Sequence, residues 1–113
     1  MSLPCPACGF LTILEESFGS YNICEICGWE DDCVQLANPA CGGGANKESL
    51  IEAQTAALQR YPLTQTEAAG FLRDNSWCPL RSAEIAIAKQ EYSEKVWKNQ
   101  AICELADTYW RKN

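Results

Sequence analysis

The chain has 113 residues, eight of them cysteine and none histidine, and its formal net charge is −6. This length excludes two full-sized domains. The lack of histidine excludes Ser-His-Asp and Cys-His catalytic sites and imidazole metal ligands. All of the charge surplus falls in residues 1–46, which hold six acidic side chains and no lysine or arginine. This distribution argues against nucleic acid as a partner, because nucleic-acid-binding proteins usually present a basic surface.

The sequence offers no membrane-directed segment. Residues 1–5 contain no basic side chain and no long apolar run, so we expect no secretion signal. The most apolar windows, residues 10–14 and 85–88, are far shorter than the roughly 20 residues of a membrane span. We therefore predict a cytoplasmic protein without membrane contact. Thiols stay reduced in the cytoplasm, which favours metal binding over disulfides, although disulfides in an exported chain are the alternative.

Short strands and turns are predicted for the first 46 residues. The β-branched, apolar segment 10–14 is typical of a strand, the glycine-containing segment 15–20 of a turn, and segment 21–23 of a second strand. We expect the two strands to pair as a hairpin with one cysteine pair at each open end. Residues 38–46 are turn-rich and lack the G-x4-G-K-[ST] spacing of a phosphate-binding loop, so we expect a turn that leads into the first helix.

Helical signals begin after residue 46. Ser49 and Glu52 fit a capping box, and the helix that follows should end at Tyr61, before Pro62. Residues 64–67 fit a second capping box, which predicts a short helix through about residue 73.

The last predicted helix is long. It begins after Ser82 and extends from residue 83 to about residue 110. Its apolar stripe has helical spacing and comprises Ile85, Tyr92, Val96, Cys103, Ala106 and Trp110. We expect this stripe to face the core, and the length of the helix leaves room for a partner or a dimer contact. The predicted fold is α+β: a small zinc-ribbon-like or rubredoxin-like β module at residues 1–46 and about three helices at 47–113, packed as one compact unit.

The two C-x2-C-G units, at residues 5–9 and 24–28, are the strongest chemical signal, and 15 residues separate the inner cysteines. Two residues between cysteines let both sulfurs bind one ion, and the following glycine can adopt the positive φ that directs N–H groups at thiolates. Two such units predict a closed tetrahedral site for one structural zinc ion. A rubredoxin-type iron site uses the same units but normally places them further apart. The expected ligands are Cys5, Cys8, Cys24 and Cys27.

Four further cysteines have no such spacing, and we expect them to be small buried apolar residues. They are Cys33, Cys41, Cys78 and Cys103. For Cys33 and Cys41, which lie near the predicted zinc module, a disulfide or an additional metal contact is the alternative.

An aromatic residue and three acids follow the second cysteine unit: Trp29, Glu30, Asp31 and Asp32. In the simplest interpretation Trp29 packs on the zinc module and the acids are solvated. In the alternative the four residues bind a partner, because a rigid aromatic side chain beside charges can anchor one. Four thiolates and one zinc ion add −2 to the formal −6, which gives about −8. This anionic module favours a basic protein partner.

Several segments resemble the bacterial cysteine-rich CPCC family. They are residues 5–12 (CPACGFLT), 21–32 (YNICEICGWEDD), 43–46 (GGAN), and the residues Ser49, Leu50, Glu52 and Ala53. The resemblance covers about residues 4–61, and Ala7 stands where the family has a cysteine at the third position of its C-P-C-C motif. It implies zinc binding, and it implies toxin immunity because some members are encoded beside secreted bacterial toxins.

The sequence therefore predicts a non-catalytic zinc-binding protein that binds and inhibits a protein partner. With the resemblance, this partner is a basic domain of a secreted toxin. One alternative is a nucleic-acid-binding zinc ribbon, although the ribbon lacks the lysines and arginines that phosphate contacts require. Another is a small redox or electron-transfer metalloprotein, which the closed site, the missing histidine and the missing cofactor loop disfavour.

Overall fold

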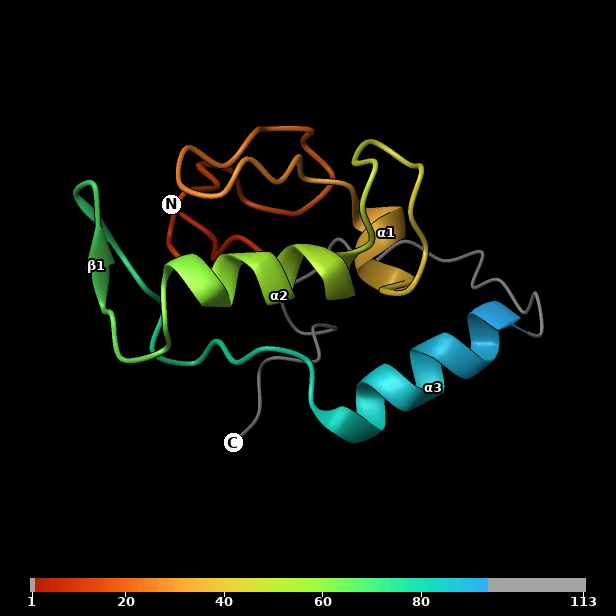
Figure 1. The fold of residues 1–113 in the computed structure, drawn as a ribbon. Coiled ribbons are helices and arrows are strands. Elements are labelled where there is room, and N and C mark those ends of the chain that lie inside the picture. The colour runs from red at the N-terminus through yellow and green to blue at the C-terminus, as the bar shows by residue number, and fades with distance from the viewer. Residues whose placement is uncertain (1, 94–113) are drawn as a thin grey trace.

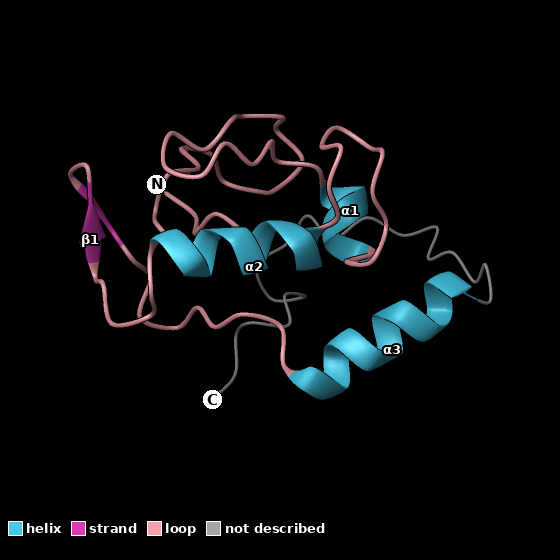
Figure 2. Ribbon diagram, viewed as in Figure 1, coloured by secondary structure: helices cyan, strands magenta, loops and turns pink. Residues whose placement is uncertain are grey.

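A computed structural model describes residues 2–93 of the chain. Its helices are α1 (Cys33–Ala37), α2 (Leu50–Arg60) and α3 (Ser82–Ser93), and its strands are β1 (Glu67–Ala68) and β2 (Phe71–Leu72). Figure 1 shows that the loops that precede α1 lie along α2. A long irregular segment connects the β1–β2 hairpin to α3. Figure 2 shows how much of this region is loop and turn. These elements confirm an α+β fold, although several of them differ from the prediction.

The two predicted strands near the N-terminus do not pair with each other. Leu3 instead bridges to Ile13 across the first cysteine pair, and Ile23 bridges to Glu30 across the second. Each cysteine turn thus brings its own flanking residues together, and the hairpin predicted between segments 10–14 and 21–23 is wrong. The physical reason is that a tight C-x2-C turn already reverses the chain, so the nearest pairing partner lies on the other side of the same turn.

Helix α2 follows the prediction closely. The Ser49 hydroxyl accepts a hydrogen bond from the Glu52 N–H at 3.2 Å, and the Glu52 carboxylate accepts one from the Ser49 N–H at 3.0 Å. This capping box satisfies two N–H groups that the helix cannot pair internally. The helix ends at Arg60 with Tyr61 as its C-cap, just before Pro62.

The predicted helix at residues 64–73 is wrong, because this segment forms the antiparallel hairpin of β1 and β2. Ala69 and Gly70 have φ angles of 49° and 88°, so both turn residues are left-handed, as a two-residue type I′ turn requires. The Leu11 N–H donates to the Leu72 carbonyl at 2.8 Å, which attaches the hairpin to the first cysteine turn. A short isolated helix is marginal in water, so this tertiary pairing decides the conformation.

Helix α3 is not the long helix that the sequence predicts. Its 12 described residues begin at Ser82, and the Glu84 carboxylate accepts a hydrogen bond from the Arg81 N–H at 2.8 Å, so the cap lies one residue before the predicted Ser82. Ala88 is buried, whereas Tyr92 of the predicted stripe is 49 % exposed. The rest of the predicted helix, with most of the stripe, lies outside the described residues. Among the described helices, none has the length and apolar character that crossing a membrane would require.

The core combines side chains from both sides of the predicted boundary at residue 46. It includes Phe10, Trp29 and Leu36 from the first part and Leu50 and Trp77 from the second. Hydrogen bonds also cross this boundary, as the next subsection describes for Gln54 and Arg73. The cysteine turns are therefore packed against α2 and the segment that follows it.

Candidate metal centre

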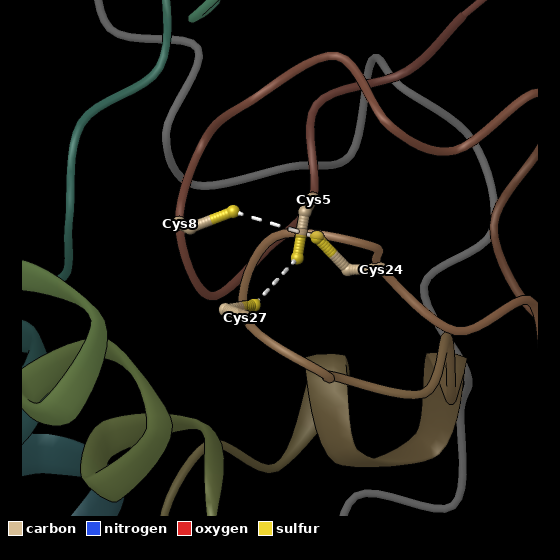
Figure 3. Close-up of side chains that lie close together, drawn as sticks. All are labelled: Cys5, Cys8, Cys24 and Cys27. Atoms are coloured by element: carbon tan, nitrogen blue, oxygen red, sulfur yellow. Dashed lines mark hydrogen bonds between the residues drawn. The ribbon is translucent and has the colours of Figure 1, made fainter. Parts of the chain in front are cut away.

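Four cysteine sulfurs come together between the two turns. The sulfurs of Cys5, Cys8, Cys24 and Cys27 all lie within 4.8 Å of one another, and Figure 3 shows the side chains converging from two loops. The Cys5 and Cys27 sulfurs are 3.6 Å apart, and the Cys8 and Cys24 sulfurs are 3.7 Å apart. Zinc–sulfur bonds of about 2.3 Å in tetrahedral geometry place sulfurs about 3.8 Å apart. The cluster can therefore hold a metal ion of this kind.

Both cysteine turns are closed by the same backbone hydrogen bonds. In the first turn the Cys5 N–H donates to the Phe10 carbonyl, and the Gly9 N–H donates to the Cys5 carbonyl, each at 2.8 Å. The second turn repeats both bonds from Cys24 and Gly28, at 2.8 and 2.9 Å. The two glycines have φ angles of 81° and 82°, which confirms the predicted left-handed conformation.

The pKa of Cys24 is shifted in the opposite direction from those of Cys5 and Cys8. Cys24 accepts hydrogen bonds from the Thr12 hydroxyl at 3.0 Å and the Ile26 N–H at 3.4 Å. Hydrogen bonds from the other three thiols, together with that from Thr12, lower the pKa of Cys24. Burial raises the pKa of the Cys5 thiol, and hydrogen bonds with the second cysteine pair raise that of Cys8. Four thiolates this close together repel one another, so a metal ion would be needed to offset their charge.

The first cysteine turn is covered by residues far along the chain. The Arg73 guanidinium, in a residue 9 % exposed, donates to the Cys8 carbonyl at 2.9 Å and lies 4.3 Å from the centre of the Phe10 ring. Its other hydrogen bonds reach the carbonyls of residues 61, 62 and 65. The Trp77 ring lies so close to Gly9 that an added Cβ would stand 2.5 Å from it.

Gln54 completes this cover. Its side-chain amide donates to the Pro6 carbonyl at 2.9 Å and accepts from the Leu80 N–H at 3.0 Å. Sequence reasoning missed Gln54, Arg73 and Trp77, because the residues that they contact in the first cysteine turn lie tens of positions away and no local spacing identifies them. The hydrogen bond from the Thr12 hydroxyl to the Cys24 sulfur was also missed, because it joins residues 12 positions apart.

The acidic segment after the second turn is mostly buried. Trp29 is 1 % exposed, Asp31 is 1 % exposed and Asp32 is 7 % exposed, whereas Glu30 is half-buried. The expectation of solvated acids is wrong for Asp31 and Asp32, and the packing of Trp29 on the cysteine turns is confirmed. As candidates for partner contact, Trp29, Asp31 and Asp32 offer almost no accessible surface in this structure.

Asp31 and Asp32 instead organise the backbone. One Asp31 oxygen accepts hydrogen bonds from the Gly19 N–H, the Ser20 N–H and the Ser20 hydroxyl at 3.0, 3.0 and 2.6 Å. One Asp32 oxygen caps α1 by accepting from the N–H groups of residues 34 and 35, and the other accepts from the Ala45 N–H at 3.1 Å. These N–H and O–H donors replace water for Asp32 and for one oxygen of Asp31, whereas the other Asp31 oxygen is buried and has no hydrogen-bond partner among the described residues.

A buried amide pair extends this network to the glycine-rich turn. Gln35 donates to the carbonyls of residues 41, 46 and 48 and accepts from the backbone and side chain of Asn46. Asn46 in turn pairs with both backbone groups of Glu30 at 2.8 Å. Gly44 is required because a Cβ there would stand 2.8 Å from an Asp32 carboxylate oxygen. The acidic segment and the glycine-rich turn thus form one clasp beside the second cysteine turn.

The remaining cysteines lie apart from the four-sulfur cluster. Cys33, Cys41 and Cys78 are half-buried and are not among the residues of the cluster found in the described part of the chain. These three cysteines are therefore less buried than predicted, and Cys33 and Cys41 do not join the four-sulfur cluster. Cys103 lies outside the described residues.

Comparison with known families identifies this same region. The family model described as Cysteine-rich CPCC matches residues 3–76, about two thirds of the chain. The match includes both cysteine turns, the clasp, α2, the β1–β2 hairpin and Arg73, and it extends beyond the residues 4–61 on which the resemblance was based. No curated protein matches the chain.

Proposed function

The chain belongs to the cysteine-rich CPCC family, and from this premise we propose that it is a non-catalytic protein in which four thiolates hold one structural zinc ion. The observation that carries the proposal is the four-sulfur cluster, with paired sulfurs 3.6 and 3.7 Å apart. Four cysteine ligands fill a tetrahedral site, so no position is open for a water nucleophile or a substrate. The metal would therefore stabilise the fold, as structural zinc does in other small domains.

Metal analysis of protein purified without chelators tests this part of the proposal. We expect one zinc ion per chain, lost in Cys24→Ser and retained in Cys41→Ser, the control, because Cys41 lies outside the cluster. Removal of the metal with a strong chelator should lower the free energy of unfolding. Iron in the purified protein, with its visible thiolate absorption, would favour the electron-transfer alternative. Full metal content in Cys24→Ser would contradict the site.

For the partner, we propose inhibition of a basic domain of a secreted bacterial toxin. What supports this is the charge distribution: the accessible acids of the first 46 residues are Glu15, Glu16 and Glu25, with half-buried Glu30. Because Asp31 and Asp32 are buried, the exposed acids of this part lie in the segment between the two cysteine turns and in the second turn itself. Complementary charge accelerates the encounter of two proteins.

Two measurements test the inhibitor proposal. Co-expression with the product of the adjacent gene should protect the host if that product is a toxin, and protection should disappear without this chain. With the purified pair, Glu16→Lys should slow association several-fold, and the effect should shrink as salt is added. Glu67→Lys is the control, because it makes the same charge change on β1. Absence of protection, or equal effects of both substitutions at all salt concentrations, would refute the proposal.

A further inference from the structure

The four sulfur ligands differ in accessibility. Cys5 and Cys8 are 0 % exposed and Cys24 is 2 % exposed, whereas Cys27 is only half-buried. The difference follows from what covers each turn. Trp77 packs directly on Gly9 of the first turn, but an added Cβ at Gly28 of the second turn would meet no atom within 4 Å. The candidate metal centre is therefore closed on the Cys5–Cys8 side and more open at Cys27.

A cavity adjoins this open ligand. It has a volume of about 310 Å³ and lies between the second cysteine turn, which contributes Cys27 and Trp29, and α2, which contributes alanines 53, 56 and 57. The small side chains of these alanines leave the space unfilled. Cavities from about 300 Å³ upward accommodate small ligands, and a water molecule occupies only about 30 Å³.

Two donor groups at the cavity favour an occupant with an acceptor atom, whereas the exposed carboxylate of Glu48, which also lines the cavity, disfavours a net anion. The Trp29 indole N–H is buried and makes no hydrogen bond within the part of the chain that the structure describes, although Trp29 lines the cavity. A buried donor of this kind is costly unless an acceptor reaches it. Arg60, an exposed cation, also lines the cavity.

From these observations we infer that the cavity is a binding site for a small external thiol and that Cys27 is the exchangeable ligand of the metal centre. This inference rests on the proposed zinc site. In the exchange, the metal–sulfur bond of Cys27 breaks and a bond to the incoming sulfur forms. The thiol proton passes to the Cys27 sulfur, and no atom changes oxidation state. Thiolate sulfur suits zinc because it is a soft ligand, and Arg60, which lines the cavity, can donate a hydrogen bond to a polar group of the entering thiol.

Chemical rescue of a truncated ligand tests the inference. Cobalt(II) is the metal probe, because its thiolate complexes absorb visible light, and 2-mercaptoethanol is the thiol probe. In Cys27→Ala we expect added thiol to restore the cobalt–thiolate absorption of the wild-type protein. In the matched variant Cys5→Ala, whose sulfur is fully buried, we expect restoration to require at least tenfold more thiol. Equal thiol requirements in the two variants, or no restoration in Cys27→Ala, would overturn the inference.

A second variant keeps the test decisive if Cys27→Ala does not fold. Ala56 is exposed and lines the cavity, so Ala56→Leu should fill space without disturbing the core. We expect it to slow thiol-dependent transfer of cobalt to a chelator by about tenfold, whereas Ala86→Leu on an exposed part of α3 should leave the rate unchanged. Equal rates in Ala56→Leu and wild-type protein would also count against the thiol site. Failure of the wild-type chain to bind cobalt would instead overturn the proposed zinc site.

Discussion

Removal of the Asp32 carboxylate should destabilise the protein by about 2 kcal/mol. In Asp32→Ala, α1 loses its N-cap acceptor for residues 34 and 35, and loss of an N-cap side chain typically costs about 1 kcal/mol. The Ala45 N–H also loses its partner, and a partly buried donor left unpaired adds about 1 kcal/mol. Together these terms predict a decrease of about 2 kcal/mol in the free energy of unfolding.

Asp32→Asn separates the two terms. Its remaining carbonyl oxygen can still cap α1, but its amide group meets the Ala45 N–H as a second donor. We therefore expect about half of the loss seen in Asp32→Ala. Equilibrium unfolding in urea, with the metal site saturated, measures each difference. Glu25→Ala is the control, because it removes the same charge from an exposed position on the second turn and should change stability by no more than about 0.5 kcal/mol.

The reasoning fails if Asp32→Ala is as stable as Glu25→Ala, because Asp32 would then act only as a surface charge. It also fails if Asp32→Asn and Asp32→Ala are equally destabilised, since the two oxygens would not have separate roles. If the substitution makes the free energy of unfolding fall more steeply with urea concentration, the unfolded state has changed and the loss cannot be assigned to the cap.

Three further predictions concern the cysteine turns and the hairpin. Because burial raises the pKa of Cys5, a bound metal must displace the thiol proton, so the affinity for cobalt should rise with pH. Cobalt titrations at about pH 6 and pH 8 measure this difference. Equal affinities at the two pH values would contradict the prediction. Gly9→Ala should lose about 1–3 kcal/mol more stability than Gly28→Ala in urea unfolding, because only Gly9 contacts Trp77. Ala69→Asn should raise the unfolding free energy by up to about 1 kcal/mol, because asparagine tolerates the φ of 49°; unchanged stability would count against strain there.

Local patterns predicted local structure well. The capping box of Ser49 and Glu52 and the stop before Pro62 depend on neighbouring residues, and α2 begins and ends as these residues indicate. The cysteine spacing identified the four sulfurs of the cluster for the same reason, because each turn is built within five or six residues.

Long-range contacts explain where sequence reasoning failed. Residues 64–67 carry a helix-like capping pattern, but pairing of Leu72 with Leu11 and the left-handed turn at Gly70 make this segment a hairpin. The acids after the second turn resemble a solvated surface in sequence. The N-cap bonds of Asp32 to residues 34 and 35 are local. The other donors lie 11 to 13 positions away, at Ser20 for Asp31 and at Ala45 for Asp32, and no local pattern reveals them.

The separation between the first cysteine turn and its cover has a consequence for biosynthesis. Gln54 bonds to a residue 48 positions earlier, and Arg73 to one 65 positions earlier. Because chains are made from the N-terminus, both cysteine turns are complete before the ribosome adds either of these residues. A newly made chain can therefore capture its metal first and be covered second. A chain refolded from denaturant has no such order, and its other thiols compete for the metal while the cover forms.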